Sequence, residues 1–356
     1  MARTLERLTQ AVEARGGAVR IVTVADPEAG PDPRVERWPS VPFWAYPQLR
    51  MAAPSRRRAR DVIERWKPTL VHVVTEFGVG LGGLLAARDA GVPVVSSYHT
   101  NFQAYLEFYR LGALDRVVWP FFRWVHNRGR RTFAPSAYVA RDLEAHGIQN
   151  VRVWSRGVDT ARFSRDFRTG AMRERLGVRD GRPLVLYVGR LAGEKGIGTL
   201  IGAMRIVREL RGDTVAFAVV GDGPAETECR ARAPEGTVFT GKLTGRELSE
   251  AYAAGDIFAF PSITETFGNV VLEAMASGMA VIAPDVGATT EYATPETARQ
   301  FGAGNAEALA DAIVALADNA EARAALQRAG LAAARARTWD AVWDTLVRDY
   351  HEAISE

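Results

Sequence analysis

Residues 257–278 of the chain read IFAFPSITETFGNVVLEAMASG, and the architecture of the protein can be worked out from this segment. Four apolar residues, Ile257–Phe260, have the composition of a buried strand. A loop that contains Glu265 follows, and the sequence predicts a helix that starts near Asn269 and stops at Gly278. A buried strand that leads through a short loop into a helix is typical of a parallel sheet with crossover helices.

The same alternation of strands and helices continues on both sides of this segment. Further strands are predicted at Val19–Val24, Leu70–Val74, Pro93–Ser97, Leu184–Val188, Val215–Val220, Val238–Thr240 and Ala280–Ala283. Helices are predicted at Ala53–Trp66, Gly82–Ala90 and Trp339–Ile354, and in the Ala/Arg-rich region Ala306–Arg337. The 356 residues are enough for two domains, so we expect an α/β fold of two Rossmann-like, doubly wound domains.

The predicted domain boundary lies near residue 160. Residues 1–160, completed by a C-terminal helix at 339–356, form the first domain, and residues 161–338 form the second. The charged stretch Val158–Thr169 lacks a core-facing periodicity and is therefore predicted to be the linker.

The first domain is predicted to begin irregularly. The chain opens with an amphipathic helix, Thr4–Arg15, whose apolar positions recur at helical spacing. A doubly wound domain normally opens with a strand and a Gly-rich loop at which a ligand phosphate approaches the backbone. We therefore expect the first strand and the Gly-rich loop of the N-terminal domain to be missing. The alternative is a domain that simply starts with a helix.

Composition excludes several classes of protein. A single cysteine, Cys229, has no partner within the chain, which excludes a disulfide scaffold and a cysteine-rich zinc site and fits a cytoplasmic protein. The sequence contains neither a run of 18 apolar residues nor a leader at Met1, so no membrane span or secretory signal is expected. The formal net charge of +3 is unevenly divided: residues 1–165 hold 25 basic and 15 acidic side chains, and the remainder hold 20 and 27.

Aromatic residues accompany the positive charge of the first half. Phe43, Trp44 and Tyr46 precede Arg56, Arg57, Arg58 and Arg60, and Trp119, Phe121, Phe122 and Trp124 adjoin Arg123, Arg128, Arg130 and Arg131. Aromatic and cationic side chains together can hold a domain on an anionic membrane without spanning it, so we expect peripheral association with the inner face of the plasma membrane. Core packing of the aromatics is the alternative. No recognition motif accompanies the arginines, so nucleic acid is not expected as a partner.

A phosphate-binding turn is predicted after the strand Leu184–Val188. Gly189 and Arg190 follow the strand directly, and Lys195, one of only three lysines in the chain, lies in the same Gly-rich turn. Ligands of open α/β sheets bind at the carboxyl ends of the strands. A guanidinium can bind two phosphate oxygens while an ammonium supplies a compact charge, a pairing suited to a diphosphate. A solvated turn is the alternative.

Two carboxylates in the segment 257–278 add to the predicted phosphate-binding turn. Glu265 lies before the predicted helix and Glu273 lies a turn inside it, so both can face one polyol from different heights. The first backbone N–H groups of the helix point to the same place.

These motifs resemble the retaining glycosyltransferases of family 4, which have the GT-B architecture of two Rossmann-like domains around a cleft, and the resemblance covers nearly the whole chain. It implies that Arg190 and Lys195 hold the diphosphate of a nucleotide sugar, that Glu265 lies near the donor sugar, and that Glu273 binds the ribose. The donor-binding residues implied in this way are Gly189, Arg190, Lys195, Gly221, Asp222, Gly223, Lys242, Leu243, Glu265, Phe267, Gly268, Asn269, Val270 and Glu273.

The first half supplies the remaining residues that the resemblance implies. Family 4 enzymes carry a histidine that faces the donor sugar at the position of His99, so the catalytic candidates are His99, Arg190, Lys195 and Glu265. The segment Arg156–Asp159 resembles the interdomain segment of a subgroup that includes bacterial mannosyltransferases and sulfoquinovosyltransferases. Acceptor-binding candidates are Glu76, Tyr98, Asn101 and Arg156, and Asp26 and Glu107 are further candidates for positioning the acceptor.

The predicted function is transfer of a hexose, preferably mannose from GDP-mannose, to a lipid or glycan hydroxyl. The chain contains no Asp-x-Asp motif, so we expect no metal and no other cofactor, with fixed cations stabilising the departing phosphate. Front-face attack by the acceptor is what the resemblance implies. The alternatives are a UDP-sugar-dependent glucosyl or sulfoquinovosyl transferase and, from another class, an inactive nucleotide-sugar-binding module.

Overall fold

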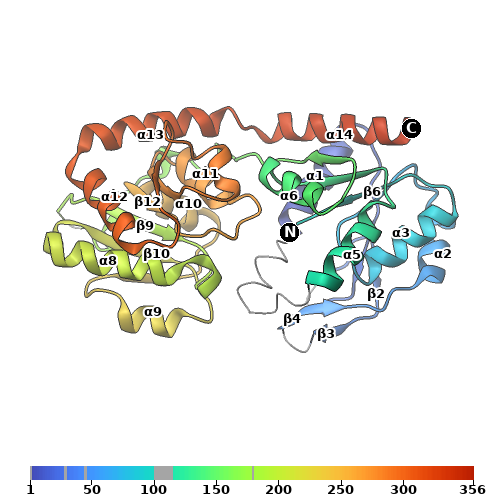
Figure 1. Ribbon diagram of the computed structural model, residues 1–356, viewed down its shortest axis with the longest axis horizontal. Helices are drawn as coiled ribbons and strands as arrows, with labels where there is room; N and C mark the ends of the chain where they lie inside the picture. Colours follow the sequence, from blue (N-terminus) through green and yellow to red (C-terminus); the bar gives the residue numbers. More distant parts are fainter. Residues whose placement is uncertain (1, 28–29, 44–45, 100–114, 179) are drawn as a thin grey trace. The chain divides into compact units, whose positions relative to one another are not determined.

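The computed structural model describes residues 2–27, 30–43, 46–99, 115–178 and 180–356, which divide into two compact units (Figure 1). Unit 1 comprises Met1–Ser155 together with Asp340–Glu356, and unit 2 comprises Arg156–Trp339. Unit 1 thus contains both the first and the last helix of the chain, and unit 2 is continuous in sequence.

Unit 2 is built on one six-stranded sheet whose strand order is β11-β10-β9-β12-β13-β14 and whose pairings are all parallel. Its strands are β9 (Leu184–Val188), β10 (Ala216–Val220), β11 (Val238–Gly241), β12 (Ile257–Ala259), β13 (Ala280–Pro284) and β14 (Arg299–Phe301). Its α-helices are α7 (Gly170–Arg175), α8 (Ile197–Arg211), α9 (Glu226–Arg232), α10 (Gly245–Ala254), α11 (Asn269–Ala276), α12 (Ala306–Asp318) and α13 (Ala320–Arg335). Its 3₁₀ turns are η2 (Arg165–Phe167), η3 (Gly193–Lys195), η4 (Gly212–Thr214) and η5 (Ala288–Glu291).

The sheet of unit 2 is buried on both faces. Along β9, Leu184, Leu186 and Val188 enter one core cluster and Val185 and Tyr187 enter the other, as the alternation of side chains along a strand requires. Helices α10 and α11 contribute to the first cluster, and α8 and α12 contribute to the second. Burial on both faces explains why the strands appear in the sequence as continuous apolar runs.

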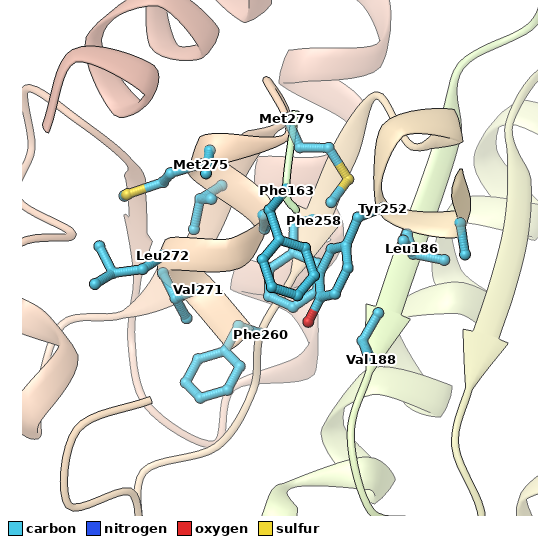
Figure 2. Close-up of a cluster of buried hydrophobic side chains, with 14 of the residues drawn as sticks. Phe163, Leu186, Val188, Tyr252, Phe258, Phe260, Val271, Leu272, Met275 and Met279 are labelled. Carbon is cyan, nitrogen blue, oxygen red and sulfur yellow. The ribbon is translucent and has the colours of Figure 1, made fainter. Parts of the chain in front are cut away.

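The first cluster is rich in aromatic and methionine side chains, which Figure 2 shows in close-up. Phe163 packs edge-on against Tyr252, with ring centroids 5.3 Å apart, and Tyr252 lies 6.0 Å from Phe258. Met275 and Met279 belong to the same cluster. Large side chains from the sheet, from α10 and from the segment before η2 thus share one core.

The prediction of a linker at residues 158–169 is wrong, because this segment packs into unit 2. Val158 and Phe163 are buried in the first core cluster. The charge of Arg168 in this segment is bound by a buried carboxylate: Arg168 donates a hydrogen bond of 2.8 Å to Asp256, which also accepts one of 2.9 Å from Arg173 of α7.

The described residues of unit 1 form three separate sheets: β1 and β2 pair in parallel, β3 and β4 pair antiparallel, and β5-β6-β7-β8 form a parallel sheet. Its strands are β1 (Ile21–Val24), β2 (Val35–Trp38), β3 (Val41–Phe43), β4 (Tyr46–Met51), β5 (Val71–Val73), β6 (Val94–Ser97), β7 (Arg131–Ala134) and β8 (Val151–Val153). Its described helices are α1 (Ala2–Ala14), α2 (Arg56–Trp66), α3 (Val79–Asp89), α5 (Asp115–His126), α6 (Ala137–Ala145) and α14 (Trp339–Ser355).

The two parallel sheets of unit 1 share a core without sharing a hydrogen bond between described strands. Trp38 from β2, Val73 from β5 and Leu84 from α3 belong to one buried cluster, against which Val22 of β1 packs. Within the described ranges, β1 pairs only with β2, and β5 only with β6. Both units are α/β with parallel sheets, which confirms the predicted fold class.

Candidate functional site

The candidate residues of unit 2 lie where the order of strands reverses. The chain adds β10 and β11 on one side of β9 and then returns to add β12 on the other side. In an open parallel sheet the crevice for a ligand lies at this switch point, outside the carboxyl ends of the strands. Arg190 follows β9 and Glu265 follows β12, so the sequence-predicted residues flank the switch point.

The two predicted phosphate ligands each contact a carboxylate. The Lys195 Nζ donates a hydrogen bond of 2.6 Å to Glu265 Oε1, which also accepts one of 3.2 Å from Ser262 Oγ. Arg190 forms an ion pair with Glu194, whose side chain is buried. The structure therefore brings together Lys195 and Glu265, which are 70 residues apart in sequence, across the switch point.

Glu273 is held by a buried phenol. The Tyr252 hydroxyl donates a hydrogen bond of 2.9 Å to Glu273 Oε2. Burial, together with the nearby Glu273 carboxylate, raises the pKa of Tyr252 well above its usual value, so the phenol keeps its proton. The direction of this hydrogen bond is consequently fixed: the Tyr252 phenol donates and the Glu273 carboxylate accepts.

Two other buried phenols hold the backbone of the same loops. Tyr187 donates to the carbonyl of Arg190 at 3.0 Å, and Tyr292 donates to the carbonyls of Phe267 and Gly268 at 2.6 and 2.8 Å. Burial raises the pKa of both tyrosines. The loop after β9 and the loop before α11 are thus each held by a buried tyrosine from inside the unit.

Glycine is required where these loops approach one another. Gly221 has a φ of 140°, and a Cβ atom there would lie 1.9 Å from the carbonyl oxygen of Gly189. Gly268, which caps α11 with a φ of 87°, would place a Cβ 2.7 Å from a methyl group of Thr289. The loop after β10 is also tied to the loop after β9, because the Leu191 amide donates to the carbonyl of Asp222 at 2.8 Å.

The remaining donor-binding predictions lie on neighbouring segments. Asn269 and Val270 form the first residues of α11, whose N-terminus carries no side-chain cap. Gly223 lies in the loop after β10. Lys242, which is exposed, and Leu243, which is buried, follow β11.

Sequence reasoning missed the residues that support the site, namely Glu194, Tyr187, Tyr252 and Tyr292. Glu194 lies four residues after Arg190, so the spacing within the motif could have identified it. Nothing in the sequence links Tyr252 to Glu273 or Tyr292 to Phe267, because these pairs meet only in the folded unit.

In unit 1, His99 follows β6 and is partly buried. Its Nε2 lies 2.8 Å from Ser97 Oγ, and its ring packs edge-on against Trp154 with centroids 5.4 Å apart. Two different elements, β6 and the segment after β8, therefore restrain the imidazole.

Two of the acceptor candidates, Glu76 and Tyr98, lie beside the same buried histidine, His126. Glu76 and Tyr98 are buried, with the Glu76 carboxylate 3.4 Å from His126 Nε2 and the Tyr98 ring 6.2 Å from the His126 ring. Arg156 is buried, which lowers its pKa to about 10, and Asp26 is exposed after β1. Asn101 and Glu107 lie outside the described residues. Burial gives Glu76 and Tyr98 a packing role, and their acceptor role stays a prediction.

The aromatic and basic residues of the predicted membrane surface divide into buried and exposed groups. Trp119 and Phe122 are buried in the core, as the alternative reading expects, whereas Trp124 is exposed. Arg131 is also buried, because it pairs with three carboxylates of the C-terminal helix α14 and its flank, and it is wrongly predicted as part of this surface. The side chains of Phe43, Trp44 and Tyr46 lie outside the described ones.

No group of three or more His, Cys, Asp or Glu side chains within the described part of the chain has the arrangement of a metal site. Likewise, no described helix is both long enough and apolar enough to cross a membrane.

Comparison with protein families gives two matches. The model described as Glycosyltransferase Family 4 matches residues 1–162, and the model described as Glycosyl transferases group 1 matches residues 182–319. The first match covers most of unit 1 and the second covers the sheet of unit 2.

Individual proteins extend these matches. The chain is 38% identical over 326 residues to a GDP-mannose-dependent alpha-mannosyltransferase of Mycobacterium tuberculosis, which covers 90% of this chain and 82% of that protein. It is 36% identical over 279 residues to the sulfoquinovosyl transferase SQD2 of Arabidopsis thaliana, covering 76% and 54%. Among solved structures, the sucrose-phosphate synthase of Thermosynechococcus elongatus aligns with a TM-score of 0.78 at 20% identity, over 99% of this chain and 93% of that chain.

Proposed function

The chain belongs to glycosyltransferase family 4 and is a hexosyltransferase with the GT-B fold, and we propose that it transfers mannose from GDP-mannose, with retention of configuration, to a lipid or glycan hydroxyl. The observation that carries the choice of donor is the 38% identity to two mycobacterial GDP-mannose-dependent alpha-mannosyltransferases over 90% of the chain.

Unit 2 supplies the donor site in this proposal. A diphosphate that enters the switch point competes with Glu265 for Lys195 and with Glu194 for Arg190, because both cations are already paired with carboxylates. Exchanging a carboxylate for a doubly charged diphosphate strengthens the attraction as negative charge grows on the leaving group. Tyr252 keeps Glu273 in place for the two ribose hydroxyls.

The proposed reaction exchanges one bond at the anomeric carbon for another. The bond to the diphosphate oxygen breaks through an oxocarbenium-like state, and the acceptor oxygen attacks from the same face. The proton of the acceptor hydroxyl passes to the departing phosphate oxygen. Lys195 and Arg190 stabilise the charge that develops on the diphosphate, so the proposed reaction needs no metal ion.

Thermal shifts with GDP, UDP, GDP-mannose and UDP-glucose test the choice of donor. A ligand present at 100 times its dissociation constant should add about 2.7 kcal/mol to the free energy of unfolding. GDP and GDP-mannose are expected to give the larger shifts, and larger shifts with the uridine compounds would favour the alternative suggested by the 36% identity to a sulfoquinovosyl transferase.

Release of nucleoside diphosphate then separates an enzyme from an inactive binding module. The enzyme is expected to release GDP from GDP-mannose when acceptor is present, and the anomeric configuration of the product can be read from its NMR coupling constants. Binding of the donor without any release or transfer would identify the module, and an inverted product would contradict the retaining mechanism.

We further propose that unit 1 contacts an anionic membrane through α5 and its neighbours. Val117 is 68% exposed, Trp124 is 39% exposed, and Phe77, stacked on Phe121 with centroids 5.2 Å apart, is 42% exposed. The guanidinium of Arg128 lies 3.9 Å above the ring of Trp124. Exposed apolar groups beside a cation can insert at a lipid interface while the cation contacts anionic headgroups.

Cosedimentation with vesicles of anionic and of zwitterionic phospholipid tests this surface. Binding to anionic vesicles is expected to weaken in Val117→Asp. The matched control is Val286→Asp, because Val286 is a 45% exposed valine of unit 2. If the unchanged protein failed to bind anionic vesicles even at low salt, the proposed membrane contact would be wrong.

A further inference from the structure

Four side chains of unit 1 form an unbroken chain of hydrogen bonds from the C-terminal helix to His99. Tyr350 Oη in α14 lies 2.7 Å from His72 Nδ1 in β5. His72 Nε2 lies 2.9 Å from Ser97 Oγ in β6, and Ser97 Oγ lies 2.8 Å from His99 Nε2. Both ring nitrogens of His72 and the hydroxyl of Ser97 thus take part in this series of hydrogen bonds.

Aromatic rings surround the middle of this chain. The ring of His72 lies 5.7 Å from that of Trp154, 5.8 Å from that of Phe133 and 5.7 Å from that of Tyr350. Burial lowers the pKa of His72 to about 3. His72 is therefore neutral at physiological pH, with one ring nitrogen that donates and one that accepts.

The hydrogen bonds from Tyr350 to His99 all run in one direction, because each of them contains a single hydrogen atom. A phenol is a stronger acid than a neutral imidazole N–H, and an imidazole nitrogen is a better acceptor than a phenol oxygen, so Tyr350 donates to His72 Nδ1. The hydrogen of His72 then lies on Nε2 and is donated to Ser97 Oγ. The Ser97 hydroxyl hydrogen in turn is donated to His99 Nε2, which must be the accepting nitrogen.

We propose that Tyr350, acting through His72 and Ser97, is a positioning residue that holds His99 as the neutral tautomer with its proton on Nδ1. A proton on His99 Nε2 would face the Ser97 hydroxyl hydrogen. This series of hydrogen bonds therefore disfavours both the tautomer protonated on Nε2 and the charged imidazolium. His99 consequently carries a hydrogen-bond donor, and not an acceptor, at Nδ1. The inference rests on the proposed function only for the role of His99 towards the sugar.

The tautomer can be measured without substrate, by long-range ¹H–¹⁵N correlation NMR of protein labelled at histidine. The protein has five histidines, and single substitutions assign their signals. His99 is expected to be neutral with its proton on Nδ1 at pH 7. In Tyr350→Phe, which keeps the ring but removes the donor, the Nδ1-protonated population of His99 is expected to fall.

A matched control separates this effect from packing of the helix. Thr345→Val also removes one hydroxyl from α14, but that hydroxyl donates only to the carbonyl of Ala341. It is expected to leave the His99 tautomer and the turnover unchanged. Ser97→Ala breaks the link nearest to His99 and should reproduce the NMR effect of Tyr350→Phe.

The kinetic arm asks whether the tautomer matters for transfer. Loss of one ordered hydrogen bond should lower kcat by roughly tenfold in Tyr350→Phe, with a smaller change in KM. His99 protonated on Nε2 in the unchanged protein, or a tautomer that Tyr350→Phe leaves untouched, would overturn the inference. Absence of any transferase activity would contradict the proposed function instead, because the NMR result is independent of turnover.

Discussion

Unit 2 has one sheet of six strands, whereas the strands that the structure describes in unit 1 are divided among three sheets. In unit 2 the residues predicted for the donor follow adjacent strands, and several contact one another, as Lys195 and Glu265 do. In unit 1 the predicted residues lie in different environments, with His99 in a hydrogen-bonded chain and Glu76 in a buried cluster. The contrast teaches that the residues predicted for the donor are brought together because they follow adjacent strands of one sheet.

The largest effect is expected from the cations of unit 2. Lys195→Ala or Arg190→Ala should lower kcat by roughly 10²–10³-fold, because in the proposed mechanism each removes a charge that stabilises the departing diphosphate. Steady-state transfer rates measure this loss. The control is Arg211→Ala, whose guanidinium pairs with Asp318 on the surface of the same unit. Near-full turnover of Lys195→Ala would show that unit 2 does not stabilise the leaving group in this way.

The next effect concerns the buried carboxylate that joins the start of unit 2 to its sheet. Asp256 accepts hydrogen bonds from Arg168, Arg173 and the Leu184 amide. Asp256→Asn should lower the free energy of unfolding by about 3 kcal/mol, since it leaves two guanidinium groups without their carboxylate. Asp318→Asn, which alters an exposed pair, is the control and should have little effect.

The same aspartate predicts a dependence on pH. Although burial alone would raise it, the pKa of Asp256 is lowered by the Leu184 amide and by Arg168 and Arg173. A folded pKa below the unfolded value means that the carboxylate stabilises the protein fully above the unfolded pKa of about 4 and loses this contribution as pH falls through the folded pKa. Urea unfolding at several pH values should show the deficit of Asp256→Asn shrinking in acid.

A smaller effect is expected when one valine is replaced in the sheet of each unit, which compares the stability of the two sheets directly. Val185 in β9 is fully buried and Val22 in β1 is only partly buried. Val185→Ala should cost about 2 kcal/mol and Val22→Ala less than about 1 kcal/mol, because the cost follows the apolar surface removed from water and the cavity left. Hydrogen exchange of peptides from β9 and β1 reports the two units separately. If both substitutions lowered the free energy of unfolding equally, the two sheets would not differ in how strongly burial stabilises them.

The smallest effect tests whether the phenol of Tyr252 supports the donor site. Tyr252→Phe removes the hydrogen bond to Glu273 and should weaken binding of the preferred nucleotide by roughly tenfold. Calorimetric titration measures the affinity. Tyr138→Phe, at an exposed tyrosine of unit 1, is the control. An unchanged affinity in Tyr252→Phe would mean that Glu273 does not need this donor.

The sequence predicts unit 2 better than unit 1, and the reason lies in the strands. Leu184–Val188 matches β9, and the helix predicted from Asn269 is α11, because strands buried on both faces stand out as apolar runs. The sequence predicts no strand at β2, β3, β4, β7, β8 or β14. In β7 the cause is visible: Arg131 and Thr132 are buried polar residues, and the carboxylates that neutralise Arg131 are more than 200 residues away in sequence.

The candidate site divides in the same way. The positions of Arg190, Lys195 and Glu265 after predicted strands could be read locally, since strand ends collect at one edge of a sheet. The partners that orient them could not, because Tyr252 reaches Glu273 and Tyr350 reaches His72 only through tertiary packing. The roles of the predicted residues towards donor and acceptor stay predictions until the substitutions above are made.

The attachment of α14 to unit 1 determines the order in which the protein can be completed during synthesis. Arg131 pairs with Asp349, Glu352 and Glu356, which are translated 218 to 225 residues later. At typical rates of translation this interval lasts about 11 to 45 s. Unit 2 is continuous in sequence and is fully translated within it, so unit 2 can finish folding while unit 1, which contains the first 155 residues, still waits for its last helix.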